Sequence, residues 1–188
     1  GASSRIGSAT AGHYQHYPFV NLGHFALHGV APERLRASLT AFYREGIETA
    51  TAAAGAGPFR LGVPFLWCSN NLVAALVTQA LVYERMTGDP RFRPFLADQL
   101  GWLLGENPWG VSMVTGWPEG GPFPTQPHLP TTDLSGRAVR GGLVDGPVKG
   151  EIFRGLKGVR LTRADAFAPC QSDEAVWHDD VMDYATNE

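Results

Sequence analysis

Two apolar segments joined by a very short connection set the strongest limit on the fold. In the first segment, which begins at Ser69 and ends before Gly88, apolar side chains recur at helical spacing over a wide arc. Serine often caps the start of a helix, and glycine often ends one. Asp89 and Pro90 are predicted to cap and open a second helix, which shows the same periodicity and stops at Gly105. Because the connection is so short, the sequence predicts two antiparallel neighbouring helices, the first of them buried. The apolar positions are Leu72, Val73, Leu76, Val77, Ala80 and Leu81 in the first helix and Phe92, Phe95, Leu96, Leu100, Leu103 and Leu104 in the second.

The remaining sequence adds further helices and one long loop region. Residues 13–30 and a stretch of about five turns after Pro32 carry apolar residues at helical spacing, and the second of these ends in the Ala/Gly-rich residues 52–57. Residues 105–150 hold ten of the 23 glycines and seven of the 14 prolines. A loop of this length in a compact domain is usually functional. The sequence therefore predicts an all-α fold of antiparallel helical hairpins, with one face built by long loops.

Length and charge exclude several classes of function. A chain of 188 residues is long enough for one domain with a substantial core. The net charge is −3 and no run of Lys or Arg is present, which argues against nucleic acid or an anionic membrane as the main partner. No apolar stretch reaches the length of a membrane span, and the opening residues GASSRIGSAT lack the apolar core of a signal peptide. Cys68 and Cys170 are predicted to be buried free thiols, with a disulfide between them as the alternative.

Histidines near the N-terminus have a spacing that suits metal ligands. His24 and His28 are four residues apart, as zinc ligands on a helix can be, and His13 and His16 lie upstream. No glutamate completes an HExxH motif and the surroundings are apolar, so the sequence favours packed core histidines and predicts no metal site. A metal-dependent hydrolase is the alternative. The nucleophile and phosphate motifs GxSxG, GxGxxG and the P-loop are absent.

The final segment, HDDVMDYATNE at residues 178–188, crowds carboxylates beside aromatic residues. Carboxylates held close together raise at least one carboxyl pKa, and a raised pKa suits a general acid near neutral pH. A solvated acidic segment is the alternative interpretation. Aromatic side chains could stack on the apolar C–H face of a sugar ring, with core packing as the alternative, and Trp109 and Trp117 look least like core residues because they lie in the Gly/Pro-rich loop. The aromatic candidates are Trp67, Trp109, Trp117, Trp177 and Tyr184.

Four motifs occur in a fixed order: LLGENPWGVSMVTG (103–116), PHLPTTD (127–133), GGLVDGP (141–147) and HDDVMDYATNE (178–188). Together they resemble the C-terminal half of the catalytic domain of glycoside hydrolase family 9, a family of inverting β-glycanases that are mostly cellulases. The stretches GVPFLWCSNNLVAALVTQ and GHYQHYPFVNLGHFAL resemble a bacterial branch whose members often carry an N-terminal immunoglobulin-like domain. The resemblance implies that residues 1–188 form the C-terminal part of a single (α/α)6 barrel.

The resemblance also implies roles for individual residues. The family's Asp-Tyr-x-x-Asn-Glu segment ends in the general acid, which corresponds to Glu188 here, and Asp183 matches its first residue. Asp179 matches a supporting acidic position, and His128 matches a substrate-binding histidine. The remaining substrate-binding residues implied are Tyr184, Asn187, Trp109, Trp67 and Trp117.

The sequence departs from the family pattern at several positions. Leu129 and Pro130 stand where a second histidine and an arginine are usual, and Val181 stands where many family cellulases have an arginine. The family's base comes from an early Asp-x-x-Asp motif, which residues 1–188 lack, and an inverting enzyme needs its two carboxyl groups roughly 6.5–9.5 Å apart. The expectation is therefore a fragment without the N-terminal half of the barrel or the helix that follows Glu188.

The implied function is inverting hydrolysis of cellulose-like β-glycans in the complete enzyme, with the isolated fragment inactive. The alternatives are a non-catalytic carbohydrate-binding or barrel-completing piece and a hydrolase of amino-sugar glycans. No cofactor is implied, and calcium in relatives is structural. The implied partners are an oligosaccharide or polysaccharide and either the missing N-terminal half or a second copy. The apolar residues Leu72, Val73, Leu76 and Val77 are expected to be covered by a second copy, by another fragment or by rearrangement. A secreted or periplasmic location follows from the family, because its polymeric substrate is outside the cell.

Overall fold

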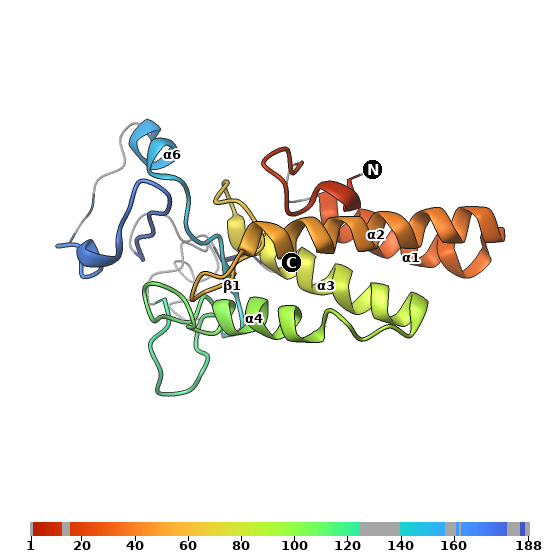
Figure 1. Cartoon of the computed structure of the whole chain (residues 1–188). Coiled ribbons are helices and arrows are strands. Elements are labelled where there is room, and N and C mark those ends of the chain that lie inside the picture. Colours follow the sequence, from red (N-terminus) through yellow and green to blue (C-terminus); the bar gives the residue numbers. More distant parts are fainter. Residues whose placement is uncertain are drawn as a thin grey trace. The chain divides into compact units, whose positions relative to one another are not determined.

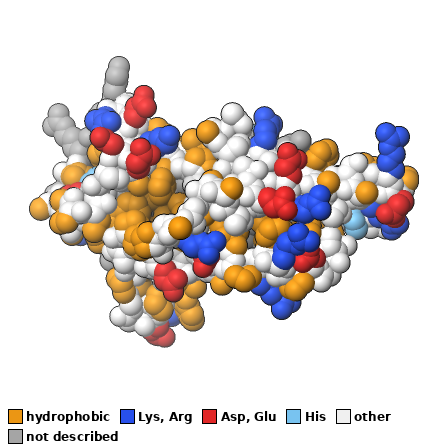
Figure 2. Space-filling view, viewed as in Figure 1, with side chains coloured by type: hydrophobic (Ala, Val, Ile, Leu, Met, Phe, Trp, Pro, Cys, Tyr) orange, Lys and Arg blue, Asp and Glu red, His pale blue; other side chains and the backbone are white. Residues whose placement is uncertain are grey.

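The computed structural model describes residues 2–12, 16–124, 140–156, 161, 163–179 and 185–186. The chain divides into two compact units. The first consists of Gly1–Pro64 and Leu72–Leu100, and the second of Phe65–Asn71 and Gly101–Glu188. None of the described helices is long and apolar enough to cross a membrane. Figure 2 shows Lys and Arg side chains interspersed with Asp and Glu over the visible face, in keeping with the absence of a basic stripe in the sequence.

Helical hairpins build the first unit. Helices α1 (His16–Val30) and α2 (Glu33–Ala54) form one hairpin, and α3 (Ser69–Thr87) and α4 (Arg93–Leu103) form a second, with the antiparallel arrangement that the short connection predicts (Figure 1). A short 3-10 helix, Ser3–Arg5, packs against α1 and α2. The core of this unit is apolar and aromatic, and its fully or nearly fully buried members include Tyr17, Leu39, Tyr43, Ile47, Leu72, Leu76 and Phe95.

The predicted helix ends are partly confirmed. Gly88 has a φ of +73° and its N–H donates to the carbonyl oxygen of Glu84 over 2.7 Å, so it ends α3 as expected. Ser69 is the first helical residue, and its hydroxyl donates to the Pro147 carbonyl oxygen over 2.6 Å. The second helix begins at Arg93, later than Asp89 and Pro90 predict, because the residues between them form a turn.

The apolar face of α3 is covered within this chain, without a second copy or another fragment. Leu72, Val73 and Leu76 are at most 1% exposed and Val77 is 9% exposed within this chain alone. One reason is the close packing around Gly62, where a β-carbon would meet the Leu76 side chain at 3.1 Å. Exposed apolar side chains in the first unit include Phe19, Leu22 and Val30 of α1, and Leu81 of α3, which is 49% exposed although the sequence predicted it on the buried face.

The second unit consists mainly of loops, with short elements that the sequence did not predict. Strand β1 (Leu143–Val144) pairs antiparallel with β2 (Ala185–Thr186), with Leu143 opposite Thr186 and Val144 opposite Ala185. Helix α6 (Gly150–Gly155) and a 3-10 helix (Ala168–Cys170) follow β1 along the chain. The core of this unit includes Trp102, Trp109, Met113, Val144, Val148 and Trp177. Both cysteines are free thiols, but only Cys68 is buried, since Cys170 is partly exposed.

Candidate functional site

Backbone pairing in the second unit brings three of the four sequence motifs together. Leu143 of GGLVDGP pairs with Thr186 of the final segment, and it also forms an antiparallel bridge with Val114 of the 103–116 motif. The Val144 N–H donates to the Met113 carbonyl oxygen over 3.0 Å, and the Val144 carbonyl accepts the Asn70 side-chain amide over 2.8 Å. The final segment is therefore paired at residues 185–186, which precede the predicted general acid by two positions in sequence.

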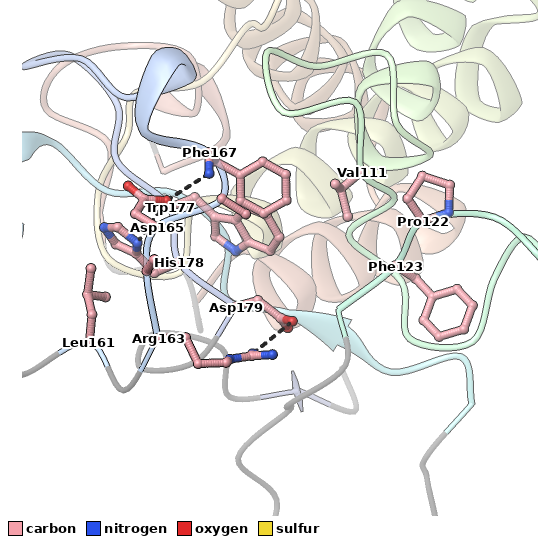
Figure 3. A pocket seen from close by; sticks show the side chains of 12 residues that line it. Val111, Pro122, Phe123, Leu161, Arg163, Asp165, Phe167, Trp177, His178 and Asp179 are labelled. Atoms are coloured by element: carbon pink, nitrogen blue, oxygen red, sulfur yellow. Dashed lines mark hydrogen bonds and ion pairs between the residues drawn. The ribbon is translucent and has the colours of Figure 1, made fainter.

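A hollow of about 290 Å³ lies in the same unit (Figure 3). Some of its lining residues come from the Gly/Pro-rich loop, and the others from residues 161–179, which run into the final motif. Its volume is at the lower end for small-molecule sites, which is compatible with one ligand ring rather than an extended chain. The lining residues are Val111, Pro122, Phe123, Leu161, Arg163, Ala164, Asp165, Ala166, Phe167, Trp177, His178 and Asp179.

An aromatic cluster supports one wall of the hollow. The Trp177 ring is fully buried, lies 5.2 Å from the Phe167 ring and meets the Trp109 ring edge-on, with their centroids 6.1 Å apart. Trp109 in turn meets Trp102 edge-on at 6.5 Å. The expectation that Trp109 is unlike a core residue is therefore wrong, since it is 5% exposed. By contrast, Trp117 is 54% exposed and Trp67 38% exposed, so these two rings remain accessible for stacking.

Charged side chains also line the hollow, some of them next to its aromatic wall. Arg163 Nη2 is 3.9 Å from Asp179 Oδ2, and Figure 3 shows this pair facing the hollow. Asp165 Oδ1 accepts the Phe167 N–H over 2.9 Å and lies 3.7 Å from Nδ1 of the buried His178. Carboxylates and a guanidinium beside apolar rings suit a ligand with one apolar face and a rim of hydroxyl groups. The apolar face can pack against the rings, and the hydroxyl groups can hydrogen-bond the charged side chains.

Of the predicted site residues, the structure places Asp179 in this hollow. Glu188, Asp183, Tyr184, Asn187 and His128 lie outside the described residues. Sequence reasoning missed Arg163 and Asp165, because residues 151–177 show no periodicity or motif that could have indicated them. Phe123 lies in the Gly/Pro-rich loop and His178 opens the final motif, but the sequence analysis assigned a site role to neither.

The N-terminal histidines make other contacts. His24 Nδ1 lies 3.4 Å from the Ser3 hydroxyl, and burial lowers the pKa of His24 below its usual value. His28 Nε2 lies 3.4 Å from the Thr40 hydroxyl. Within the described part of the chain, no three His, Cys, Asp or Glu side chains gather closely enough to hold a metal ion. His13 lies outside that part.

Comparison with known proteins gives the family. The sequence model of glycosyl hydrolase family 9 matches residues 26–188. The chain belongs to this family. Two solved family 9 structures share its fold: the endoglucanase J30, with a TM-score of 0.65 and 21% identity, and AaCel9A in complex with cellobiose-like isofagomine, with a TM-score of 0.54 and 22% identity. The alignments cover 87% and 84% of this chain but 31% and 30% of those proteins, so the chain spans about a third of their length. No curated protein sequence matches it.

The family assignment confirms the predicted fold class. The described residues are mainly helical, with two-residue strands, and their likeness to the family 9 structures identifies them as part of the (α/α)6 barrel. The resemblance inferred from the four motifs is likewise confirmed, since the family match runs from residue 26 through all of them.

Proposed function

We propose that this chain is the acid-bearing, C-terminal part of a glycoside hydrolase that cleaves β-linked glycans of the cellulose and β-glucan type with inversion. One observation carries the proposal: β1 and β2 join the final motif to the GGLVDGP motif in the unit that contains the ring-sized hollow. Membership of family 9 supports hydrolysis as the activity. The named neighbours, an endoglucanase and AaCel9A in complex with cellobiose-like isofagomine, favour a β-glucan substrate.

In the proposed reaction, the carboxyl group of Glu188 donates its proton to the glycosidic oxygen as the leaving group departs. A carboxylate outside this chain takes a proton from water, and that water attacks the opposite face of the sugar ring. Inverting enzymes hold these two carboxyl groups roughly 6.5–9.5 Å apart, which leaves room for the water. Asp179 supports the acid, because a nearby negative charge favours the protonated form of Glu188 at neutral pH. The chemistry requires two carboxyl groups and no cofactor.

The other predicted residues bind the substrate in this proposal. His128, Tyr184 and Asn187 hydrogen-bond the sugar hydroxyls, and Trp67 and Trp117 offer exposed ring faces for stacking. Trp109 is buried, so in our proposal it supports the wall of the hollow through Trp177. The hollow binds one pyranose ring, with the apolar face of the ring toward Phe123 and Phe167. A polymeric glycan substrate implies a secreted or periplasmic protein.

Two other functions make different predictions. A non-catalytic glycan-binding or barrel-completing piece would bind oligosaccharides without cleaving them, even when the remaining barrel is supplied. An amino-sugar hydrolase would cleave chito-oligosaccharides in preference to cello-oligosaccharides.

The test measures hydrolysis of soluble β-glucan and of both oligosaccharide series, by this chain alone and by a longer protein that completes the barrel. In the longer protein, Glu188→Gln should lower kcat on β-glucan by about 10²- to 10⁴-fold, the usual contribution of a general acid. Glu174→Gln is the matched control, because Glu174 is an exposed carboxylate that does not line the hollow. Unchanged activity after Glu188→Gln would contradict the proposal.

A further inference from the structure

The side-chain amide of Gln171 makes four hydrogen bonds in the second unit. Its Oε1 accepts the indole N–H of Trp109 over 3.2 Å and the backbone N–H of Trp177 over 3.1 Å. Its Nε2 donates to the backbone carbonyl oxygen of Trp177 over 2.6 Å and to Asp165 Oδ2 over 3.3 Å. These contacts use both donor hydrogens and both acceptor sites of a primary amide.

The partners of Gln171 determine which way its amide points. An indole N–H and a backbone N–H can only donate, so both must face the amide oxygen. A backbone carbonyl and a carboxylate can only accept, so both must face the NH₂ group. Rotating the amide by half a turn would lose all four hydrogen bonds and oppose like groups. The orientation is therefore fixed by hydrogen-bond chemistry.

These contacts hold several lining residues of the hollow. The Gln171 amide bonds both the N–H and the carbonyl oxygen of the Trp177 backbone, as a neighbouring strand would. The lining residues His178 and Asp179 follow Trp177 directly in the chain. The same NH₂ group holds Asp165, another lining residue. Gln171 itself does not line the hollow. Its influence on a bound ligand would therefore pass through these neighbours.

We propose that Gln171 is the positioning residue of this sugar-binding hollow, fixing Asp165 and the 177–179 segment so that both carboxylates meet one sugar ring in a defined geometry. The inference rests on the proposed function, because it takes a glycan ring as the ligand. Small displacements of binding groups can reduce rate or affinity by up to about a hundredfold, so the loss of this amide should be measurable.

The decisive variant is Gln171→Glu, which keeps the shape and one oxygen of the side chain but replaces the NH₂ group by a second oxygen. When ionised, the new carboxylate faces the Trp177 carbonyl oxygen and the Asp165 carboxylate and repels both. When protonated, its O–H can donate to one of them. The like charge of the neighbouring Asp165 and the partial burial of residue 171 raise the pKa of such a carboxyl group above its ordinary value. The function of the variant should therefore depend on pH in a way that the native chain does not.

The affinity for cellotetraose, measured by calorimetry from about pH 5 to about pH 7.5, is the first readout. Relative to the native chain, Gln171→Glu should bind almost normally at the acidic end and at least about tenfold more weakly at the neutral end. Gln171→Met, which keeps the length without a buried charge, should bind more weakly at every pH and covers the case in which the glutamate variant unfolds. Equal affinities of the native chain and both variants across this range would overturn the proposal.

Gln99→Glu is a matched control in the first unit. Gln99 is a buried glutamine whose Oε1 accepts the Gly62 N–H over 2.9 Å and whose Nε2 donates to the Arg60 carbonyl oxygen over 2.7 Å. Its replacement should lower stability at neutral pH without changing the affinity of the folded chain for cellotetraose. An equal loss of affinity in this control would show that any buried glutamate weakens binding, and would contradict a specific role for Gln171.

A second readout does not depend on the ligand. The NMR resonance of the Trp109 indole N–H should shift as the carboxyl group introduced by Gln171→Glu titrates, because that proton is donated to the same side chain. Suppose that the native chain fails to bind cellotetraose, while in the Gln171→Glu variant the Trp109 indole resonance shifts with pH. The proposed function would then be wrong, and the hydrogen-bonded cluster would be confirmed. A resonance that does not change with pH in the variant would contradict the cluster itself.

Discussion

The carbonyl oxygen of Ser3 occupies the space where a side chain at Gly46 would begin. A β-carbon on Gly46 would lie 1.9 Å from that oxygen and 2.6 Å from Nε2 of Gln79. Gln79 in turn donates to the carbonyl oxygens of Ser3 and Tyr43, over 2.8 and 3.1 Å, so one buried amide ties α3 to the N-terminal segment and to α2.

We expect Gly46→Ala to destabilise the chain by about 3 kcal/mol or more, because the backbone of the N-terminal segment must move to admit the methyl group. Urea unfolding followed by circular dichroism measures the change. The control is Gly23→Ala in α1, where no atom lies within 4 Å of the new β-carbon. That variant should stabilise the helix by about 0.5–1 kcal/mol. Equal effects of the two substitutions would contradict the close packing at Gly46.

The GGLVDGP motif offers a second glycine test. Gly146 has a φ of +83°, and a β-carbon there would lie 2.3 Å from Cγ of Asn70. Gly141 has a similar φ of +80° with nothing within 4 Å. Both alanine variants therefore share a backbone cost of about 1–2 kcal/mol, and only Gly146→Ala adds a steric clash. We expect Gly146→Ala to be the more destabilising of the two by at least about 1 kcal/mol in thermal unfolding. A larger loss at Gly141 would show that the clash is relieved by movement of Asn70.

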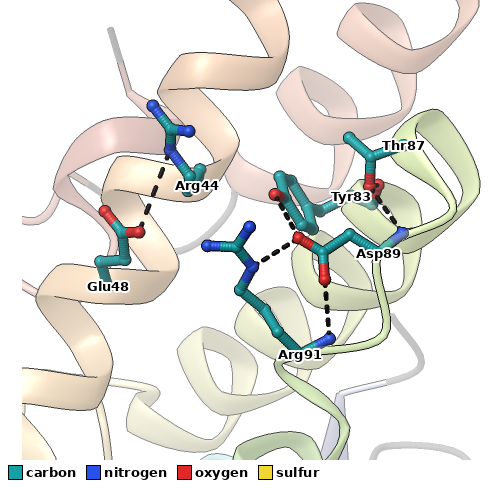
Figure 4. A network of polar contacts seen from close by, with 6 residues as sticks. All are labelled: Arg44, Glu48, Tyr83, Thr87, Asp89 and Arg91. Carbon is teal, nitrogen blue, oxygen red and sulfur yellow. Dashed lines mark hydrogen bonds and ion pairs between the residues drawn. The ribbon is translucent and has the colours of Figure 1, made fainter.

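The turn between α3 and α4 contains a charged network that should respond to acid (Figure 4). Asp89 accepts the Arg91 N–H over 3.1 Å and the Tyr83 hydroxyl over 3.2 Å, and it pairs with the Arg91 guanidinium. The hydrogen bond from the Arg91 N–H is the main reason that the pKa of Asp89 lies below its usual value. A group whose pKa is lowered by folding stabilises the folded state above its unfolded pKa, near 3.9, and loses that effect as the pH falls through its folded pKa.

We therefore expect Asp89→Asn to reduce the stability of the folded chain at neutral pH. The variant should also lose less further stability than the native chain as the pH falls below about 4. Asp173→Asn removes an exposed carboxylate and is the control. It should leave the fall in stability at acidic pH nearly unchanged. Thermal unfolding across the acid range compares the two variants. An acid limb in Asp89→Asn that runs parallel to that of the native chain would refute this assignment.

Buried tyrosines should govern how the stability of the folded chain changes at high pH. Tyr43 is fully buried and its hydroxyl donates to the Asn21 carbonyl oxygen over 2.5 Å; burial raises its pKa well above the usual value. A pKa raised by folding means that stability is fully present below the unfolded pKa, near 10, and falls as the pH rises beyond it.

Tyr43→Phe should lose about 1 kcal/mol at neutral pH, because the hydrogen bond disappears, yet should lose less additional stability above about pH 10. Tyr17→Phe should change the alkaline slope in the same direction, since burial also raises the pKa of Tyr17. Urea unfolding at several alkaline pH values measures both slopes. Steeper alkaline loss in either variant would contradict the role of burial.

The sequence predicted those features of the structure well that depend on residues close together in the chain. The hairpin of α3 and α4 follows from apolar periodicity and from Gly88, whose positive φ ends the first helix. The family resemblance likewise rests on short motifs, and the family match from residue 26 confirms it. Helix starts were less predictable, because the Ser69 hydroxyl bonds Pro147, a residue far away in sequence, instead of capping its own helix.

Burial was the main source of error. Trp109 lies in a loop rich in glycine and proline, yet Trp102 and Trp177 enclose it, and its indole N–H is satisfied by Gln171. For the apolar face of α3, the sequence left open whether a second copy, another fragment or rearrangement covers it, and the structure shows it covered within this chain. The exposure of a side chain depends on partners that are distant in sequence, which a local pattern does not specify.

The sequence by itself determined the helices, the loop-rich face and the family, since each depends on the order of neighbouring residues. Only the tertiary structure decided the hollow and the hydrogen bonds of Gln171. Phe123, Asp165 and Asp179 belong to different segments of the chain and share no periodicity. They come to line one hollow because backbone pairing and one fully hydrogen-bonded amide hold those segments in the same unit. Such long-range hydrogen bonds and packing contacts carry the information that the linear pattern lacks.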